Sequence, residues 1–327
     1  NPSVNDIEGL ELKRFNIGEG GYQYQDQNNC KAITLRADSE GLYNTGFLYL
    51  DIPLIIEGTN MTISSTSTLV PRRGWRSYDD KPCGIVKIGS GTSGFSNING
   101  GSAECAGFKY VELQEGNWAY GLNGQKHMHY LPAGQVFTFG AKNTGLWIGA
   151  PCVFTNFWLR ETGTAVGKPH TIGNQNDNGK ILRGKLTICG TPPDDSTVFT
   201  GTFVTCADFC WAPDSATKEF VVAGGNNTTT GDLEVANGTV RLTNGSTYSK
   251  LDKLTLSGGA NTRLQLDTVP SVAFRGKLLS LATGREKISA PSGARLTFDR
   301  GTVGAPLCDP GDRLSSAEVA SATLLLP

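Results

Sequence analysis

The chain has 327 residues, enough for two domains or one elongated solenoid, and its formal charge of −1 provides no basic stripe to neutralise nucleic-acid phosphates. No apolar run is long enough to cross a bilayer, so we expect neither nucleic-acid binding nor a membrane span. The 42 glycines and the low share of charged residues, 18%, favour an all-β protein whose short strands are joined by many turns.

The first half of the chain, residues 1–167, is rich in aromatic residues and irregular in pattern. Its polar start alternates only at residues 10–12 and 15–17, which predicts an edge strand or a cap. Further strands are predicted at residues 32–36, 47–56, 61–65, 84–88, 108–113, 135–139, 146–148 and 152–160. Such spacing, with Gly, Asn and Ser turns in between, is typical of an antiparallel sandwich.

Segments of this half are similar to laminin-G or concanavalin-like sandwiches. Residues 61–64 resemble their apolar-Thr-apolar-Ser strand, and residues 145–149 with 154–159 resemble their closing strands. The resemblance implies an irregular, concanavalin-like sandwich domain at residues 1–167. The alternative is that a solenoid begins near residue 30 and that this half is its irregular N-terminal part.

The second half, residues 168–327, has a simpler pattern. Its short strands are predicted at residues 181–182, 185–188, 198–204, 220–222, 233–235, 240–242, 254–256, 264–266, 278–281 and 295–298. Each offers only two or three inward aliphatic residues, so a core forms only if the strands stack in parallel as a solenoid. The alternative is a second antiparallel sandwich.

One stretch of this half, residues 218–246, resembles the autotransporter-associated β-strand repeat of bacterial surface and secreted proteins. The matching residues are Gly225, Asn227, Thr228, Thr230, Gly231, Gly238, Thr239, Val240 and Leu242. The resemblance implies a right-handed parallel β-helix in a bacterial protein that is secreted or displayed on the cell surface.

The ends of the chain suggest a piece of a longer polypeptide, because it starts at Asn1 without Met and stops within an apolar, strand-like run. We expect the last strand to be able to pair with a neighbouring chain or with the continuation of its own.

Eight cysteines are spread along the chain, and an exported location would favour disulfides among some of them. Cys206 and Cys210 form the closest pair and are the candidates for a local bridge. The alternative is that the cysteines are buried thiols that serve as small apolar residues.

Aromatic residues of the first half are candidates for glycan binding, since sugar rings pack on aromatic faces. The candidates are Trp75, Tyr78, Trp118, Tyr120, Tyr130 and Trp147. Large aromatics also fill cores, and we expect only about two of these six to be exposed enough to bind a sugar.

Two weak metal-binding patterns are present, and neither comes with enough ligands to predict a resident cofactor. His127 and His129 would point to the same side of a strand and could chelate a metal. Asp79 and Asp80 lie on a turn-like segment and could bind Ca²⁺, which needs six or more oxygens.

Three functions are consistent with the sequence. We expect a non-catalytic module of a secreted or cell-surface protein, an adhesin or stalk, with glycan recognition by the first half. The alternative is a β-helical polysaccharide lyase or hydrolase, although the acids of the second half stand apart in sequence, whereas glycoside cleavage needs two at a fixed separation. The third is a structural subunit of a surface assembly.

Overall fold

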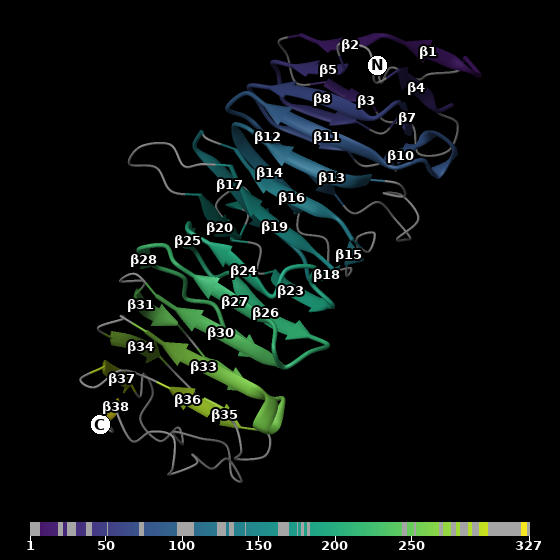
Figure 1. Cartoon of the computed structure of the whole chain (residues 1–327). Coiled ribbons are helices and arrows are strands. Elements are labelled where there is room, and N and C mark those ends of the chain that lie inside the picture. The colour runs from purple at the N-terminus through teal and green to yellow at the C-terminus, as the bar shows by residue number, and fades with distance from the viewer. Residues whose placement is uncertain are drawn as a thin grey trace. The chain divides into compact units, whose positions relative to one another are not determined.

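The structure is a computed structural model. It describes residues 7–18, 22–24, 31–36, 41–50, 52–71, 75–96, 108–122, 129–130, 134–140, 142–162, 170–174, 176–177, 180–181, 184–243, 247–251, 253–267, 271–275, 279–281, 287–289, 294–299 and 322–325. The fold is all-β, a β-solenoid of about eight turns (Figure 1). Its contacts divide into two units, which are described separately.

The first unit comprises residues 1–154, 161–168 and 175–182. Its longest sheet contains β2 (Arg14–Ile17), β5 (Gly41–Asn44), β8 (Asn60–Ser65), β11 (Cys83–Ile88), β13 (Phe108–Leu113) and β16 (Val136–Phe139). A second sheet contains β1 (Leu10–Leu12), β4 (Ile33–Arg36), β7 (Leu54–Glu57) and β10 (Trp75–Ser77), after which the short 3₁₀ turn η1 (Tyr78–Asp80) follows. A third sheet contains β3 (Tyr22–Tyr24), β6 (Leu48–Leu50) and β9 (Leu69–Pro71), and a fourth contains β12 (Thr92–Ser96), β14 (Gly116–Leu122) and β17 (Thr144–Ile148). The remaining strands are β15 (His129–Tyr130), which pairs with β18 (Cys152–Thr155), and the hairpin of β21 (Asn176–Asp177) and β22 (Lys180–Ile181).

The second unit comprises residues 155–160, 169–174 and 183–327. One sheet contains β23 (Lys185–Gly190), β26 (Asp208–Pro213), β29 (Leu233–Val235), β32 (Leu254–Leu256) and β35 (Leu279–Leu281). A second contains β24 (Ser196–Phe199), β27 (Glu219–Val222), β30 (Gly238–Leu242), β33 (Thr262–Leu266) and β36 (Lys287–Ser289). A third sheet contains β28 (Asn226–Asn227), β31 (Thr247–Leu251), β34 (Ser271–Arg275), β37 (Ala294–Asp299) and β38 (Ala322–Leu325). The other elements are β19 (Trp158–Glu161), β20 (Thr171–Gly173), which pairs with β25 (Thr202–Phe203), and the 3₁₀ turn η3 (Gly259–Asn261).

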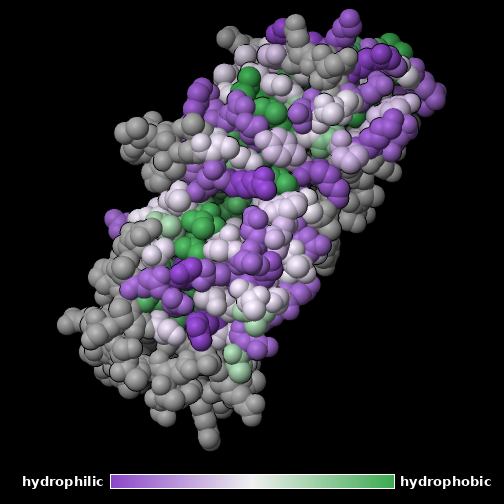
Figure 2. All heavy atoms as spheres, in the orientation of Figure 1, coloured by the Kyte–Doolittle hydropathy of each residue, from purple (hydrophilic) through white to green (hydrophobic). Residues whose placement is uncertain are grey.

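Parallel stacking turns small aliphatic sets into a shared core. Leu233 pairs with Leu254 and Val235 with Leu256, so like residues lie over one another on successive strands, and all four are buried. A strand with two inward residues cannot form a core alone, but a column of such strands removes every inward side chain from water. The parallel solenoid expected for the second half is therefore confirmed. On the face drawn in Figure 2, the coloured surface is mostly polar, and apolar atoms gather in a few groups between the polar ones.

The concanavalin-like sandwich expected for residues 1–167 is not confirmed. A sandwich of that kind requires antiparallel neighbours, whereas the described strand pairs up to residue 162 are parallel, for example Leu10 with Ile33 and Ile63 with Lys87. The only antiparallel pair in the described part of this unit is the short hairpin β21–β22. Several predicted strands are present, among them residues 61–65 in β8 and 84–88 in β11, whereas β5, β10, β12 and β14 were not predicted. Short strands at this spacing also fit successive solenoid turns.

Candidate functional site

The aromatic residues predicted to bind sugars are largely part of the core. Trp75, Trp118 and Tyr120 are at most 1% exposed, so none of them can present a ring to a sugar, and these three assignments are wrong. Tyr120 instead donates its hydroxyl to Gln135 Oε1 (3.2 Å) and packs edge-on against Phe154. Their large rings fill the inward positions of a wide solenoid interior, where they remove the most apolar area from water.

The other three aromatic candidates have different surroundings. Tyr78 lies in η1 and is 42% exposed, with the Lys81 ammonium 5.9 Å from its ring centre. Trp147 is partly buried against Val70 and Ala119. Tyr130 belongs to β15, but its side chain lies outside the described part of the structure.

The predicted metal ligands are not brought together within the described residues. Asp79 is exposed, has a left-handed backbone (φ 51°) and forms an ion pair with Lys81 at 3.9 Å. His127 and the side chains of Asp80 and His129 lie outside the described residues. Where the structure describes side chains, no group of three His, Cys, Asp or Glu residues could hold a metal ion. The calcium and histidine sites therefore stay predictions.

No disulfide joins the described cysteines, and the Cys206–Cys210 bridge is absent. Cys206 lies in the turn before β26, whereas Cys210 lies within the strand, where its thiol hydrogen-bonds to Glu234 on the neighbouring strand. Burial raises the pKa of Cys210 to about 12, so its thiol stays protonated at neutral pH and behaves as a small apolar residue.

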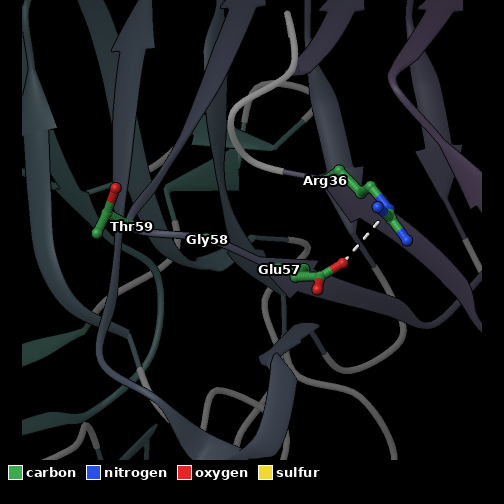
Figure 3. A pocket seen from close by; sticks show the side chains of 4 residues that line it. All are labelled: Arg36, Glu57, Gly58 and Thr59. Atoms are coloured by element: carbon green, nitrogen blue, oxygen red, sulfur yellow. Dashed lines mark ion pairs between the residues drawn. The ribbon is translucent and has the colours of Figure 1, made fainter.

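A pocket of about 350 Å³ lies in the first unit, lined by Arg36, Glu57, Gly58 and Thr59 (Figure 3). The Arg36 side chain points toward Glu57, with its Nε 3.5 Å from the carboxylate, and also contacts the Glu11 carboxylate at 2.5 Å. The guanidinium thus joins β1, β4 and β7 across three successive strands. All three side chains are substantially exposed, so solvent screens this ladder and each pair stabilises the fold by about 1 kcal/mol or less.

A charge cluster of the second unit lies on the outer face of β23, β26 and β29. Lys185 Nζ is 2.5 Å from Glu234 Oε2, although β26 runs between their two strands. Ser257 donates to the other oxygen of Glu234 at 3.3 Å. Burial opposes the charge on both groups, yet the pKa of Lys185 is raised by its bond to Glu234, and the pKa of Glu234 is lowered by the same bond. The pair is therefore held fully ionised at neutral pH.

A second network joins three strands on the other sheet of that unit. Arg241 on β30 binds Glu219 on β27 and lies 3.6 Å from Asp267, which follows β33. Ser196 on β24 adds a hydrogen bond to Glu219 at 3.2 Å. As in the Lys185 cluster, charges that are far apart in sequence neutralise one another across solenoid turns.

A lysine lies inside the core of the first unit. Lys87 stacks in register between Ile63 on β8 and Leu113 on β13, and it is fully buried. Its ammonium contacts four backbone carbonyls at 2.6 to 3.4 Å: those of Ile88 and Gly89, which follow it in the chain, and those of Ser65 and Glu115 from neighbouring turns. Burial lowers its pKa to about 8, against the weaker influence of the Glu115 carboxylate.

The outer face of the β5–β13 part of the first unit carries two half-buried tyrosines, Tyr43 and Tyr110. Tyr110 donates its hydroxyl to Glu112 Oε2 (2.5 Å), and Gln114 donates to Glu112 Oε1 (2.8 Å). The alternation of residues 108–113 would have placed Tyr110 and Glu112 on the same outward face. Neither Tyr43 nor Tyr110 was among the predicted sugar-binding residues.

Sequence reasoning also missed Lys87, Lys185 and Glu234. Lys185 and Glu234 are 49 positions apart, and only the strand register brings them together. Strand alternation places Lys87 on the same side as Ile85. The sequence does not show that four backbone carbonyl oxygens surround this inward lysine.

Comparison with known proteins gives no relative for this chain: no family model, no curated protein and no solved structure matches it. Within the described residues, no helix is both long and apolar enough to cross a membrane.

Proposed function

We propose that the chain is a non-catalytic β-solenoid module, a stalk or adhesin part of a secreted or cell-surface protein. The observation that supports this most directly is that charged side chains of the second unit form ion pairs from one turn to another. Lys185 with Glu234, and Arg241 with Glu219 and Asp267, tie strands together across the sheet. Networks of this kind add to the backbone ladders and the shared core that already join each turn to its neighbours.

The direction of the pKa shifts supports a structural role for these charges. A general acid in glycoside cleavage needs a carboxyl group whose pKa is raised, so that it holds a proton near neutral pH. The pKa values of Glu115 and Glu234 are both shifted the other way, Glu115 chiefly by its hydrogen bond from Lys142 and Glu234 by its bond from Lys185 against burial. A carboxylate held ionised by a lysine is suited to holding strands together.

The resemblance of residues 225–242 to autotransporter-associated repeats supports the proposed location on or outside a bacterial cell. The solenoid itself is compatible with that role, because each turn contacts its neighbours alone and length is gained by adding turns.

A second candidate function is a β-helical polysaccharide lyase or hydrolase, and one observation favours it. The structure brings Asp208, Lys185 and Glu234 onto the same face of neighbouring strands, although these residues stand apart in sequence. Carboxylates together with a lysine on adjacent turns are the groups that such chemistry would use.

Turnover assays separate the two functions. The purified chain is incubated with a panel of neutral and acidic polysaccharides, and reducing ends and unsaturated products are followed. We expect no products above the buffer level, and we expect Glu234→Gln to lower the melting temperature. Turnover that the wild type shows and Glu234→Gln loses would contradict the non-catalytic role and establish the second candidate.

A further inference from the structure

We infer that the outer sheet face of the first unit, across β5, β8, β11 and β13, binds an uncharged polysaccharide chain with Tyr110 as its stacking ring. This inference rests on the proposed function, since it gives the non-catalytic module a ligand class. It also replaces the buried rings of Trp75, Trp118 and Tyr120 with a site that is on the surface.

The Tyr110 ring is held in a defined place on the sheet. Tyr110 pairs in register with Gly84, and a Cβ added at Gly84 would lie only 2.9 Å from Tyr110 Cδ1. The absence of a side chain at Gly84 therefore lets the tyrosine lean over the neighbouring strand. The bond from its hydroxyl to Glu112 fixes the ring further. A half-buried ring with a fixed orientation binds the CH surface of a sugar at little entropic cost.

Polar groups suited to sugar hydroxyls lie beside the ring. Glu112 accepts one hydrogen bond on each carboxylate oxygen, from Tyr110 and from Gln114. Each oxygen has further lone pairs, and the Gln114 amide adds both a donor and an acceptor. Because these residues alternate along and just after one strand, they lie in a row on the same side of the sheet.

The charges of this face favour a neutral ligand. The Arg14 guanidinium stacks over the Tyr43 ring at 4.0 Å and donates to Asn16, so at the β2–β5 end its charge is already engaged. At the β13 end, the Glu112 carboxylate is already hydrogen-bonded. The Glu112 carboxylate beside the Tyr110 ring would repel a polyanion, whereas sugar hydroxyls can donate hydrogen bonds to it.

Between β5 and β13, outward positions carry side chains smaller than tyrosine. Tyr43 pairs with Ser64 and Ser64 with Ile88, while Thr62 pairs with Val86, and all of these outward residues are half-buried. Four neighbouring strands at ~4.8 Å spacing give a sheet face about 14 Å wide. A face of that width suits an extended polymer rather than a single sugar.

Native affinity electrophoresis tests the inference. The intact chain is run through gels that contain hydroxyethylcellulose, a β-1,3-glucan or galactomannan, and through gels that contain polygalacturonate or alginate. We expect retardation by at least one neutral polymer and by neither acidic one. Tyr110→Ala should weaken binding about tenfold. The matched control, Phe47→Ala, removes an aromatic ring that is 42% exposed and lies between β5 and β6, outside this face, and should bind as the wild type does.

Two further variants keep the test decisive if Tyr110→Ala fails to fold. Tyr110→Phe keeps the ring and should retain most of the binding, whereas Glu112→Ala should weaken it. Retardation by acidic polymers alone, or equal binding by wild type, Tyr110→Ala and Glu112→Ala, would overturn the inference. A lack of retardation in every gel would also overturn the binding inference, but it would not contradict the proposed function. Cleavage of a bound neutral polymer would instead overturn the proposed function and leave this binding site in place.

Discussion

The ammonium of Lys87 donates a hydrogen bond of 2.6 Å to the carbonyl of Gly89, inside a column of side chains that is otherwise apolar on either side. Gly89 belongs to the turn after β11, and its left-handed backbone (φ 81°) aims that carbonyl inward. The same ammonium also contacts the carbonyl of Ile88 on its own strand and those of Ser65 and Glu115 from the turns on either side. The lysine therefore joins three successive turns through hydrogen bonds that an aliphatic side chain could not make.

Lys87 should make stability depend on alkaline pH. Its pKa is about 8 in the folded chain and 10.5 in the unfolded chain, so between these values the unfolded state binds more protons. The free energy of unfolding should therefore rise with pH from about 8 to 10.5, by up to about 3 kcal/mol. Urea unfolding measured at several pH values across this window gives the slope.

Lys87→Met is the control for that slope, because it fills the same space without a titrating group. The difference between wild type and variant isolates Lys87 from tyrosines, cysteines and other lysines that titrate nearby in pH. Parallel pH profiles of the two proteins would contradict the account of a buried, perturbed lysine.

Two adjacent glycines should respond very differently to the same substitution. A Cβ at Gly224 would lie 1.6 Å from the carbonyl oxygen of Gly201, whereas a Cβ at Gly225 would meet nothing within 4 Å. We expect Gly224→Ala to destabilise the fold by about 3 kcal/mol or more and Gly225→Ala to stay within about 1 kcal/mol of wild type. Thermal unfolding followed by circular dichroism measures both. Similar melting temperatures for the two variants would refute the close stacking of these turns.

Asn227 should be required for the corner that it fills. Its buried amide accepts a hydrogen bond from the Phe203 backbone N–H at 2.8 Å and donates to the Gly225 carbonyl at 3.0 Å. Asn227→Ala leaves that buried N–H without its acceptor, which should cost about 1–3 kcal/mol. The exposed neighbour provides the control, and Thr228→Ala should unfold at nearly the wild-type urea concentration. Equal losses would mean that the Asn227 amide is not an internal brace.

The Lys185–Glu234 pair should make stability fall in acid. Because the pKa of folded Glu234 lies below its ordinary value of 4.5, its contribution is present above that value and is lost as pH falls through the lowered one. Glu234→Gln should remove about 1 kcal/mol at neutral pH and flatten the acid limb of the profile. Glu8→Gln, in which a side chain 88% exposed is changed, should leave the profile as it is. An unchanged acid limb in Glu234→Gln would count against the pair.

The positions of the strands could be predicted from sequence where aliphatic residues alternate between clear turns. The predicted strand at residues 233–235 is β29, and that at residues 254–256 is β32. A bend between two strands within one predicted strand was not predicted. Residues 152–160 are broken at Asn156, whose left-handed backbone (φ 53°) separates β18 from β19. Asparagine can adopt this backbone conformation, but a single polar residue also fits an outward position of an unbroken strand.

Strand direction and long-range pairing were harder to predict in the first half than the strands themselves. The spacing of short strands is the same for a sandwich and for a solenoid with irregular turns, and aromatic residues such as Trp118 fit the core of either fold. Ion pairs such as Lys185 with Glu234 depend on register, which a one-residue slip would destroy. The candidate surfaces therefore follow from the stacking and not from any local motif.

The central claim, that successive strands stack in parallel and in register, is tested most directly by distances along one column. Ser196, Glu219, Thr239, Arg263 and Lys287 occupy one register position on five consecutive strands. One spin label is placed at Ser196 and a second at Arg263 or Lys287, and the distance between the labels is measured by pulsed electron paramagnetic resonance. The backbone separations should be about 14 Å to Arg263 and about 19 Å to Lys287, so that the two differ by one strand spacing. Separations beyond about 30 Å, or a shorter distance to Lys287 than to Arg263, would contradict the stacked solenoid.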